Sequence, residues 1–114
     1  MLLTLGPRLG SMLIAFSVAP SGSDESAGSV SEAVAAAVRI VRDSGLPNHT
    51  DSMFTSVEGT WDECMDVVRR ACEAVGRFGP RVSLVLKADI RPGYEGELTA
   101  KVERLEQVLG HQQP

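Results

Sequence analysis

The residues most able to do chemistry lie in a few short segments, and the sequence leaves two interpretations open for each. Glu58 ends an expected strand just before Gly59, so its carboxylate could bind a ligand at the strand end or simply be solvated. Lys87, Asp89 and Arg91 alternate along another strand, where they could line a polar pocket or form an ion-pair ladder between subunits. These segments favour a binding site over a catalytic one.

Two further segments lie where the chain turns. Ser17, Ser21 and Gly22 stand where a strand gives way to a helix start, which is a place suited to a polar or anionic group. Their composition is equally that of an ordinary loop. Residues 53–55 lie in an expected hairpin, where packing explains them as well as ligand recognition does.

The sequence contains no catalytic signature: the patterns GxxxxGK[ST], GxGxxG and GxSxG are all absent. His49 and Asp51 are separated by one residue, which is too weak a pair to predict a metal site. Cys64 and Cys72 fall on one expected helix, about 12 Å apart along its axis. That is too far for a disulfide, so both are predicted to be buried thiols in a reducing cytosol. We expect no enzyme, no metal and no cofactor.

The composition narrows the class of partner. The chain has 114 residues, 43% of them hydrophobic and 23% charged, with a net charge of −4. This predicts one globular domain without the positive surface that nucleic acids or anionic lipids attract. The five aromatic residues are too few for base stacking. They are Phe16, Phe54, Trp61, Phe78 and Tyr94.

No run approaches the roughly 20 apolar residues of a membrane span, and residues 1–19 lack the uninterrupted apolar stretch of a secretory signal. We expect a cytoplasmic protein that binds neither nucleic acid nor membrane.

Hydrophobic spacing and turn residues predict seven elements. These are a strand over 12–19, a helix over 29–44, two short strands between 48 and 59 meeting near Ser52, a helix over 60–75, a strand over 81–91 and a helix over 98–109. The first and second helices are each expected to begin with a capping box, Ser-x-x-Glu at 29–32 and Thr-x-x-Glu at 60–63.

The same spacing predicts which side chains are buried. The first strand reads as buried on both faces. The buried stripes of the three helices are expected to be Val30, Val34, Ala37, Val38 and Val41; Trp61, Met65, Val68, Cys72 and Val75; and Leu98, Val102, Leu105 and Leu109.

The order β-α-β-β-α-β-α predicts an α+β fold, namely a ferredoxin-like two-layer sandwich with an additional C-terminal helix. We expect one domain over 12–110, a disordered extension or mis-assigned start over 1–11, and a frayed tail over 111–114. In this fold the last strand lies at a sheet edge and one sheet face has no helices. That face is half apolar, so we expect self-association as a homodimer or homotetramer through the last strand and the open face.

The order of the segments resembles the small thiamine-binding protein family, which is related to the YkoF-like domains. The resemblance covers Met12 to about Leu109. It is carried by Ser17-Val18-Ala19-Pro20-Ser21-Gly22 and Ser44-Gly45-Leu46, by Met53-Phe54-Thr55-Ser56-Val57-Glu58-Gly59, and by Arg81-Val82 with Lys87-Ala88-Asp89-Ile90-Arg91. The chain departs from the family pattern at Phe54, where glycine is usual, and at Ile90, where a second acidic residue is common.

The resemblance implies a ferredoxin-like oligomer that binds thiamine or its hydroxymethylpyrimidine part without catalysis. Ser17, Thr55 and Glu58 are then the candidates for hydrogen bonds to an aminopyrimidine, because hydroxyls and a carboxylate match its donors and ring nitrogens. Met53 and Phe54 would be apolar walls. The alternative is an oligomeric regulatory or structural module of the same fold that binds another small ligand, an anion or a protein.

Overall fold

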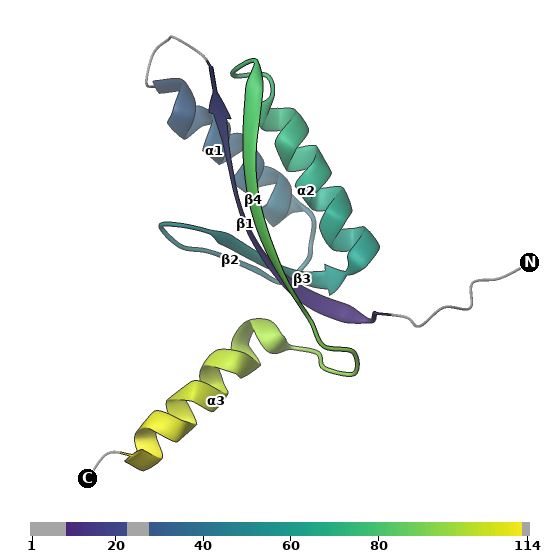
Figure 1. The fold of residues 1–114 in the computed structure, drawn as a ribbon, viewed down its shortest axis with the longest axis vertical. Helices are drawn as coiled ribbons and strands as arrows, with labels where there is room; N and C mark the ends of the chain where they lie inside the picture. The colour runs from purple at the N-terminus through teal and green to yellow at the C-terminus, as the bar shows by residue number, and fades with distance from the viewer. Residues whose placement is uncertain (1–8, 23–27, 113–114) are drawn as a thin grey trace, which may run out of the picture.

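The computed structural model describes residues 9–22 and 28–112, and within them it contains seven elements in the predicted order (Figure 1). These are β1 (Ser11–Ser21), α1 (Gly28–Asp43), β2 (Asn48–Thr50), β3 (Thr55–Thr60), α2 (Trp61–Val75), β4 (Arg81–Ile90) and α3 (Glu97–Gln112). The predicted pair of short strands is present as β2 and β3, joined by the turn at residues 51–54.

The four strands form one antiparallel sheet in the order β2-β3-β1-β4, with α1 and α2 packed side by side on one face (Figure 1). This confirms the ferredoxin-like class, and β4 lies at the edge as expected. Side chains that pair across strands project from the same face. Leu13 pairs with both Glu58 and Asp89, and Ala15 pairs with Lys87, so these residues lie on the face opposite α1 and α2. We call this surface the open face.

The prediction that β1 is buried on both faces is wrong. Met12, Ile14, Phe16 and Val18 are buried under the helices, whereas the alternate residues are only half-buried because the open face has no helix layer. β1 also begins one residue earlier than predicted, at Ser11, and continues through Pro20 to Ser21. Pro20 is tolerated because that part of β1 has no strand neighbour on its β3 side.

The helices bury only part of the predicted stripes: Ala37, Val41, Val68 and Val75 are buried as expected, whereas Val102, Leu105 and Leu109 of α3 are exposed. In α1 the buried residues are Ala33, Ala37 and Val41, while Val30 and Val34 are exposed. Small alanines allow α1 to approach α2 closely, so the stripe is rotated by about one position. In α2 the buried residues are Cys64, Val67, Val68, Ala71, Ala74 and Val75. Trp61 is exposed, and Met65 and Cys72 are only half-buried.

One of the two predicted capping boxes is confirmed. The Thr60 hydroxyl accepts from the Glu63 amide at 3.2 Å, and the Glu63 carboxylate accepts from the Thr60 amide at 2.9 Å. The other prediction is wrong, because α1 already begins at Gly28 and Ser29 therefore lies inside the helix. At the chain ends, α3 continues through His111 to Gln112, so the tail is shorter than predicted. Residues 1–8 of the expected extension lie outside the described residues.

Candidate functional site

The candidate site arises because β1 is longer than the strand beside it. β1 pairs with β4 as far as Ser21, but its pairing with β3 ends at Phe16, opposite Thr55. Beyond that point the chain of β3 leaves the sheet through the turn at residues 51–54. The edge of β1 after Phe16 therefore faces a cavity instead of another strand among those described.

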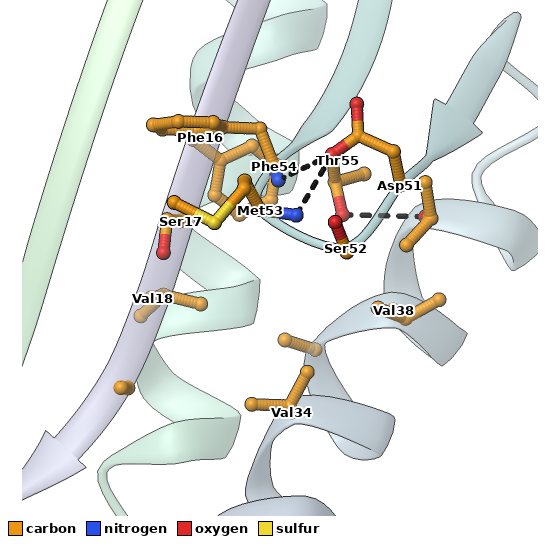
Figure 2. A pocket seen from close by; sticks show the side chains of 13 residues that line it. Phe16, Ser17, Val18, Val34, Val38, Asp51, Ser52, Met53, Phe54 and Thr55 are labelled. Carbon is orange, nitrogen blue, oxygen red and sulfur yellow. Dashed lines mark hydrogen bonds between the residues drawn. The ribbon is translucent and has the colours of Figure 1, made fainter.

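The cavity has a volume of about 180 Å³ and lies between β1, the β2–β3 turn and α1 (Figure 2). Figure 2 shows Phe16, Met53 and Phe54 along one side of it, with Val34 and Val38 of α1 across from them. Its lining is Phe16, Ser17, Val18, Ala19, Val34, Ala37, Val38 and residues 50–55. Mostly apolar walls with a few hydroxyls and one carboxylate are typical of a small-molecule site.

Asp51 organises the turn that forms the cavity rim. Its carboxylate accepts hydrogen bonds from the Phe54 amide at 2.9 Å and the Met53 amide at 2.8 Å (Figure 2). These bonds, chiefly that from Phe54, lower the pKa of Asp51 below its usual value. Asp51 is therefore a fixed negative charge at neutral pH, and it is the one charged side chain in the lining. Next to it, the hydroxyls of Thr50 and Thr55 lie 3.3 Å apart.

The cavity brings together four of the ten candidate residues from the sequence: Ser17, Met53, Phe54 and Thr55. Sequence reasoning did not select Asp51 or the α1 residues. A signal for Asp51 was present in the sequence. Aspartate is common at the first position of a turn, where its side chain accepts a hydrogen bond from the backbone amide two residues later. The residues of α1 that line the cavity had no such signal, because a valine such as Val34 is equally typical of the hydrophobic core.

Glu58 lies on the open face and contacts α3 instead of the cavity. Its carboxylate oxygens accept hydrogen bonds from the Glu97 amide at 3.1 Å and the Leu98 amide at 3.2 Å. The side chain therefore caps the first turn of α3, and only 5% of Glu58 is exposed.

Lys87 and Asp89 of β4, and Arg91 just after it, do not line the cavity. Asp89 forms an ion pair of 2.6 Å with Lys101 of α3. Arg91 stacks on the Tyr94 ring and donates to its hydroxyl at 2.8 Å. Lys87 is exposed and makes no salt bridge within the described part of the chain.

The last two candidates lie at the far end of β1. Ser21 pairs with Arg81 at the beginning of β4. Gly22 follows with a φ of +83°, a conformation that favours glycine, and a Cβ there would meet Pro80 at 3.1 Å. Neither residue lines the cavity.

The two cysteines are free thiols, Cys64 buried and Cys72 half-buried. Burial raises the pKa of Cys64 from 9.0 to about 11, and burial also raises the pKa of Cys72.

We expect neither native thiol to react appreciably with a thiol reagent at pH 8, while in the unfolded chain both cysteines react. The unfolded Cys64 thiol ionises near pH 9.0 and the folded one near 11. The folded state is therefore expected to lose stability as the pH rises through that interval. Rapid labelling of the native protein at pH 8 would contradict this.

Residues 9–22 and 28–112 hold no cluster of three or more histidine, cysteine, aspartate or glutamate side chains able to hold a metal ion. Within the same ranges, no helix is both long enough and apolar enough to cross a membrane.

The sequence and fold are similar to those of known proteins. A family model described as thiamine-binding protein matches residues 14–106. A UPF0045 protein of Mycobacterium bovis is 55% identical over 100 residues, which cover 87% of this chain and 95% of that protein. A solved domain of unknown function, DUF77, from Bacillus cereus has 28% identity and a TM-score of 0.73, covering 87% of this chain and 94% of its own. A hypothetical protein from Methanocaldococcus jannascii has 27% identity and a TM-score of 0.74, covering 84% and 96%.

Proposed function

The chain belongs to the thiamine-binding protein family, and on that premise we propose that it binds the hydroxymethylpyrimidine part of thiamine, free or within thiamine, in the cavity between β1 and α1. The observation that carries the proposal is the cavity itself, with apolar walls, hydroxyls and one fixed carboxylate. Binding is reversible and without catalysis, in the cytoplasm, and requires no cofactor.

The cavity size supports a single ring. Its volume of about 180 Å³ lies below the roughly 300 Å³ at which pockets for drug-sized ligands begin. An aminopyrimidine between Phe54 and the α1 valines would bury both of its faces in apolar surroundings. The remainder of thiamine would extend past the rim into solvent.

The polar groups of the lining support the same assignment. An aminopyrimidine offers an amino donor and ring nitrogens that accept. The Thr55 hydroxyl, which lies with Phe16 on the helix side of the sheet, can donate to a ring nitrogen, and the Asp51 carboxylate can accept from the amino group. Asp51 at the rim also favours a ligand that carries a positive thiazolium, and the net charge of −4 acts in the same direction.

Titration calorimetry with thiamine and with hydroxymethylpyrimidine tests the proposal directly. We expect both to bind, because the ring that they share occupies the cavity, and thiamine to bind more tightly, because its positive thiazolium lies near Asp51. Thr55→Val keeps the shape and removes the hydroxyl, and is expected to weaken both ligands about tenfold, equivalent to one hydrogen bond of about 1.4 kcal/mol. Thr99→Val, at an exposed threonine of α3, is the control and leaves the affinity unchanged. The absence of binding by the folded protein at millimolar ligand would refute the proposal.

A further inference from the structure

The cavity between β1 and α1 carries charge of one sign only. Asp51 is the one charged acidic side chain of its lining, and the described residues that form its walls include no lysine, arginine or histidine. Proteins usually bind phosphate groups through such basic side chains, which form charge-assisted hydrogen bonds with the anion. The walls of this cavity therefore offer a phosphate group no cation with which to pair.

The backbone amides of the turn at residues 51–54 are occupied as well. Free amides in a turn commonly bind an anion. Here the Oδ1 atom of Asp51 accepts from the Met53 amide at 2.8 Å and from the Phe54 amide at 2.9 Å (Figure 2). The Asp51 amide in turn donates to the Phe54 carbonyl at 2.9 Å. The turn thus holds its own carboxylate at the amides to which an external anion would bind.

The beginning of α1 does not replace these amides. The amides that lack a helical partner lie in the first turn of a helix, where they favour anions. α1 begins at Gly28, whereas the α1 residues that line the cavity begin at Val34, about 9 Å further along the helix axis. Among the described residues of the lining, an anionic group would find neither a cation nor an amide from the start of a helix.

We propose that Asp51 selects the ligand by its phosphorylation state, so that the cavity takes free hydroxymethylpyrimidine and rejects its phosphate ester. This inference rests on the proposed function, in which the Asp51 carboxylate accepts from the ring amino group. The hydroxymethyl group is attached to the neighbouring ring carbon, so a phosphate on it lies beside the same carboxylate, well within the screening length of about 10 Å at 0.1 M salt. A phosphate monoester carries a charge between about −1.5 and −2 at pH 7, so the two groups repel each other.

Thiamine is expected to show the same preference more weakly. Its phosphate is attached beyond the thiazolium ring, which places a positive charge between Asp51 and the phosphate. The net charge of −4, in contrast, acts on both phosphate esters alike. A penalty that is larger for hydroxymethylpyrimidine than for thiamine is therefore the signature of a carboxylate beside the pyrimidine.

Calorimetry at pH 8 tests the proposal with hydroxymethylpyrimidine, thiamine and the monophosphate of each. In about 50 mM salt we expect phosphorylation to weaken the binding of hydroxymethylpyrimidine by about tenfold or more and that of thiamine by about threefold. In about 0.5 M salt we expect both ratios to fall, because the repulsion is screened.

Asp51→Asn separates the charge of this side chain from its shape. The asparagine oxygen can replace Oδ1 as the acceptor for both turn amides, while the other oxygen becomes an uncharged amide group. We expect the free ligand to bind more weakly, but the ratio between phosphorylated and free hydroxymethylpyrimidine to fall below about threefold. Asp43→Asn removes an equal charge from an exposed position of α1 outside the cavity, and is expected to keep the wild-type ratio.

The possible contrary results have different meanings. Equal affinity of the wild-type protein for hydroxymethylpyrimidine and its phosphate would overturn this inference and leave the proposed function standing. An unchanged ratio in Asp51→Asn, or an equal fall of the ratio in Asp43→Asn, would overturn the role of Asp51. Failure of the folded protein to bind any of the four ligands would refute the proposed function, and this inference with it.

Discussion

Replacing Val34 with tryptophan is expected to abolish binding of thiamine and hydroxymethylpyrimidine, with a loss of at least a hundredfold in affinity. Val34 lines the cavity from α1 and is 39% exposed, so a larger side chain can enter the cavity without displacing the core. An indole would occupy much of a volume of about 180 Å³. We expect the free energy of unfolding to change by less than about 0.5 kcal/mol, as for most surface substitutions.

Val30→Trp is the matched control. Val30 lies one turn earlier on the exposed side of α1, is 48% exposed and does not line the cavity. It receives the same bulk on the same helix and is expected to retain wild-type affinity in calorimetry. If Val34→Trp folds and still binds with wild-type affinity, the ligand does not occupy this cavity, and the proposed site is wrong even if the protein binds thiamine elsewhere.

The order of the elements and the place of β4 at the edge of the sheet could be predicted from the sequence, because turn residues and apolar runs alternate clearly. The burial of α1 could not. A hydrophobicity pattern favours the valines at 30 and 34 over Ala33, yet Ala33 is buried beside the predicted Ala37 while both valines are exposed. What decides this is how closely two helix backbones approach each other, which is a property of the pair and not of either segment.

The candidate site was predictable only in part for a related reason. The cavity depends on where pairing between β1 and β3 ends, and register is set by two strands together. The separation of Glu58 from Thr55, in contrast, follows from strand parity. Residues three apart in a strand project from opposite faces, so Thr55 lies with Phe16 under the helices and Glu58 lies on the open face.

Glu58→Ala is expected to release the first turn of α3 from the sheet. Glu58 is 5% exposed, and its carboxylate accepts from the amides of Glu97 and Leu98, which have no partner within their own helix. Removing the cap is expected to destabilise α3 by about 1–2 kcal/mol. Because the direction of α3 depends on this anchor, we expect the helix content of the protein to fall, measured by circular dichroism.

Two companion variants distinguish this anchoring role from the binding role that the sequence suggested for Glu58. Glu58→Gln keeps one acceptor and places an amide donor against the other N–H, so an intermediate effect on α3 is expected. Glu63→Gln alters a carboxylate that caps α2 at Thr60, and we expect α3 to be unaffected. In hydrogen exchange, the amides of Glu97 and Leu98 should lose protection in both Glu58 variants and keep it in Glu63→Gln. Thiamine affinity should stay unchanged in Glu58→Gln, because the cavity lies on the other side of the sheet. A loss of thiamine affinity while the α3 amides stay protected from exchange would instead mean that Glu58 contacts the ligand.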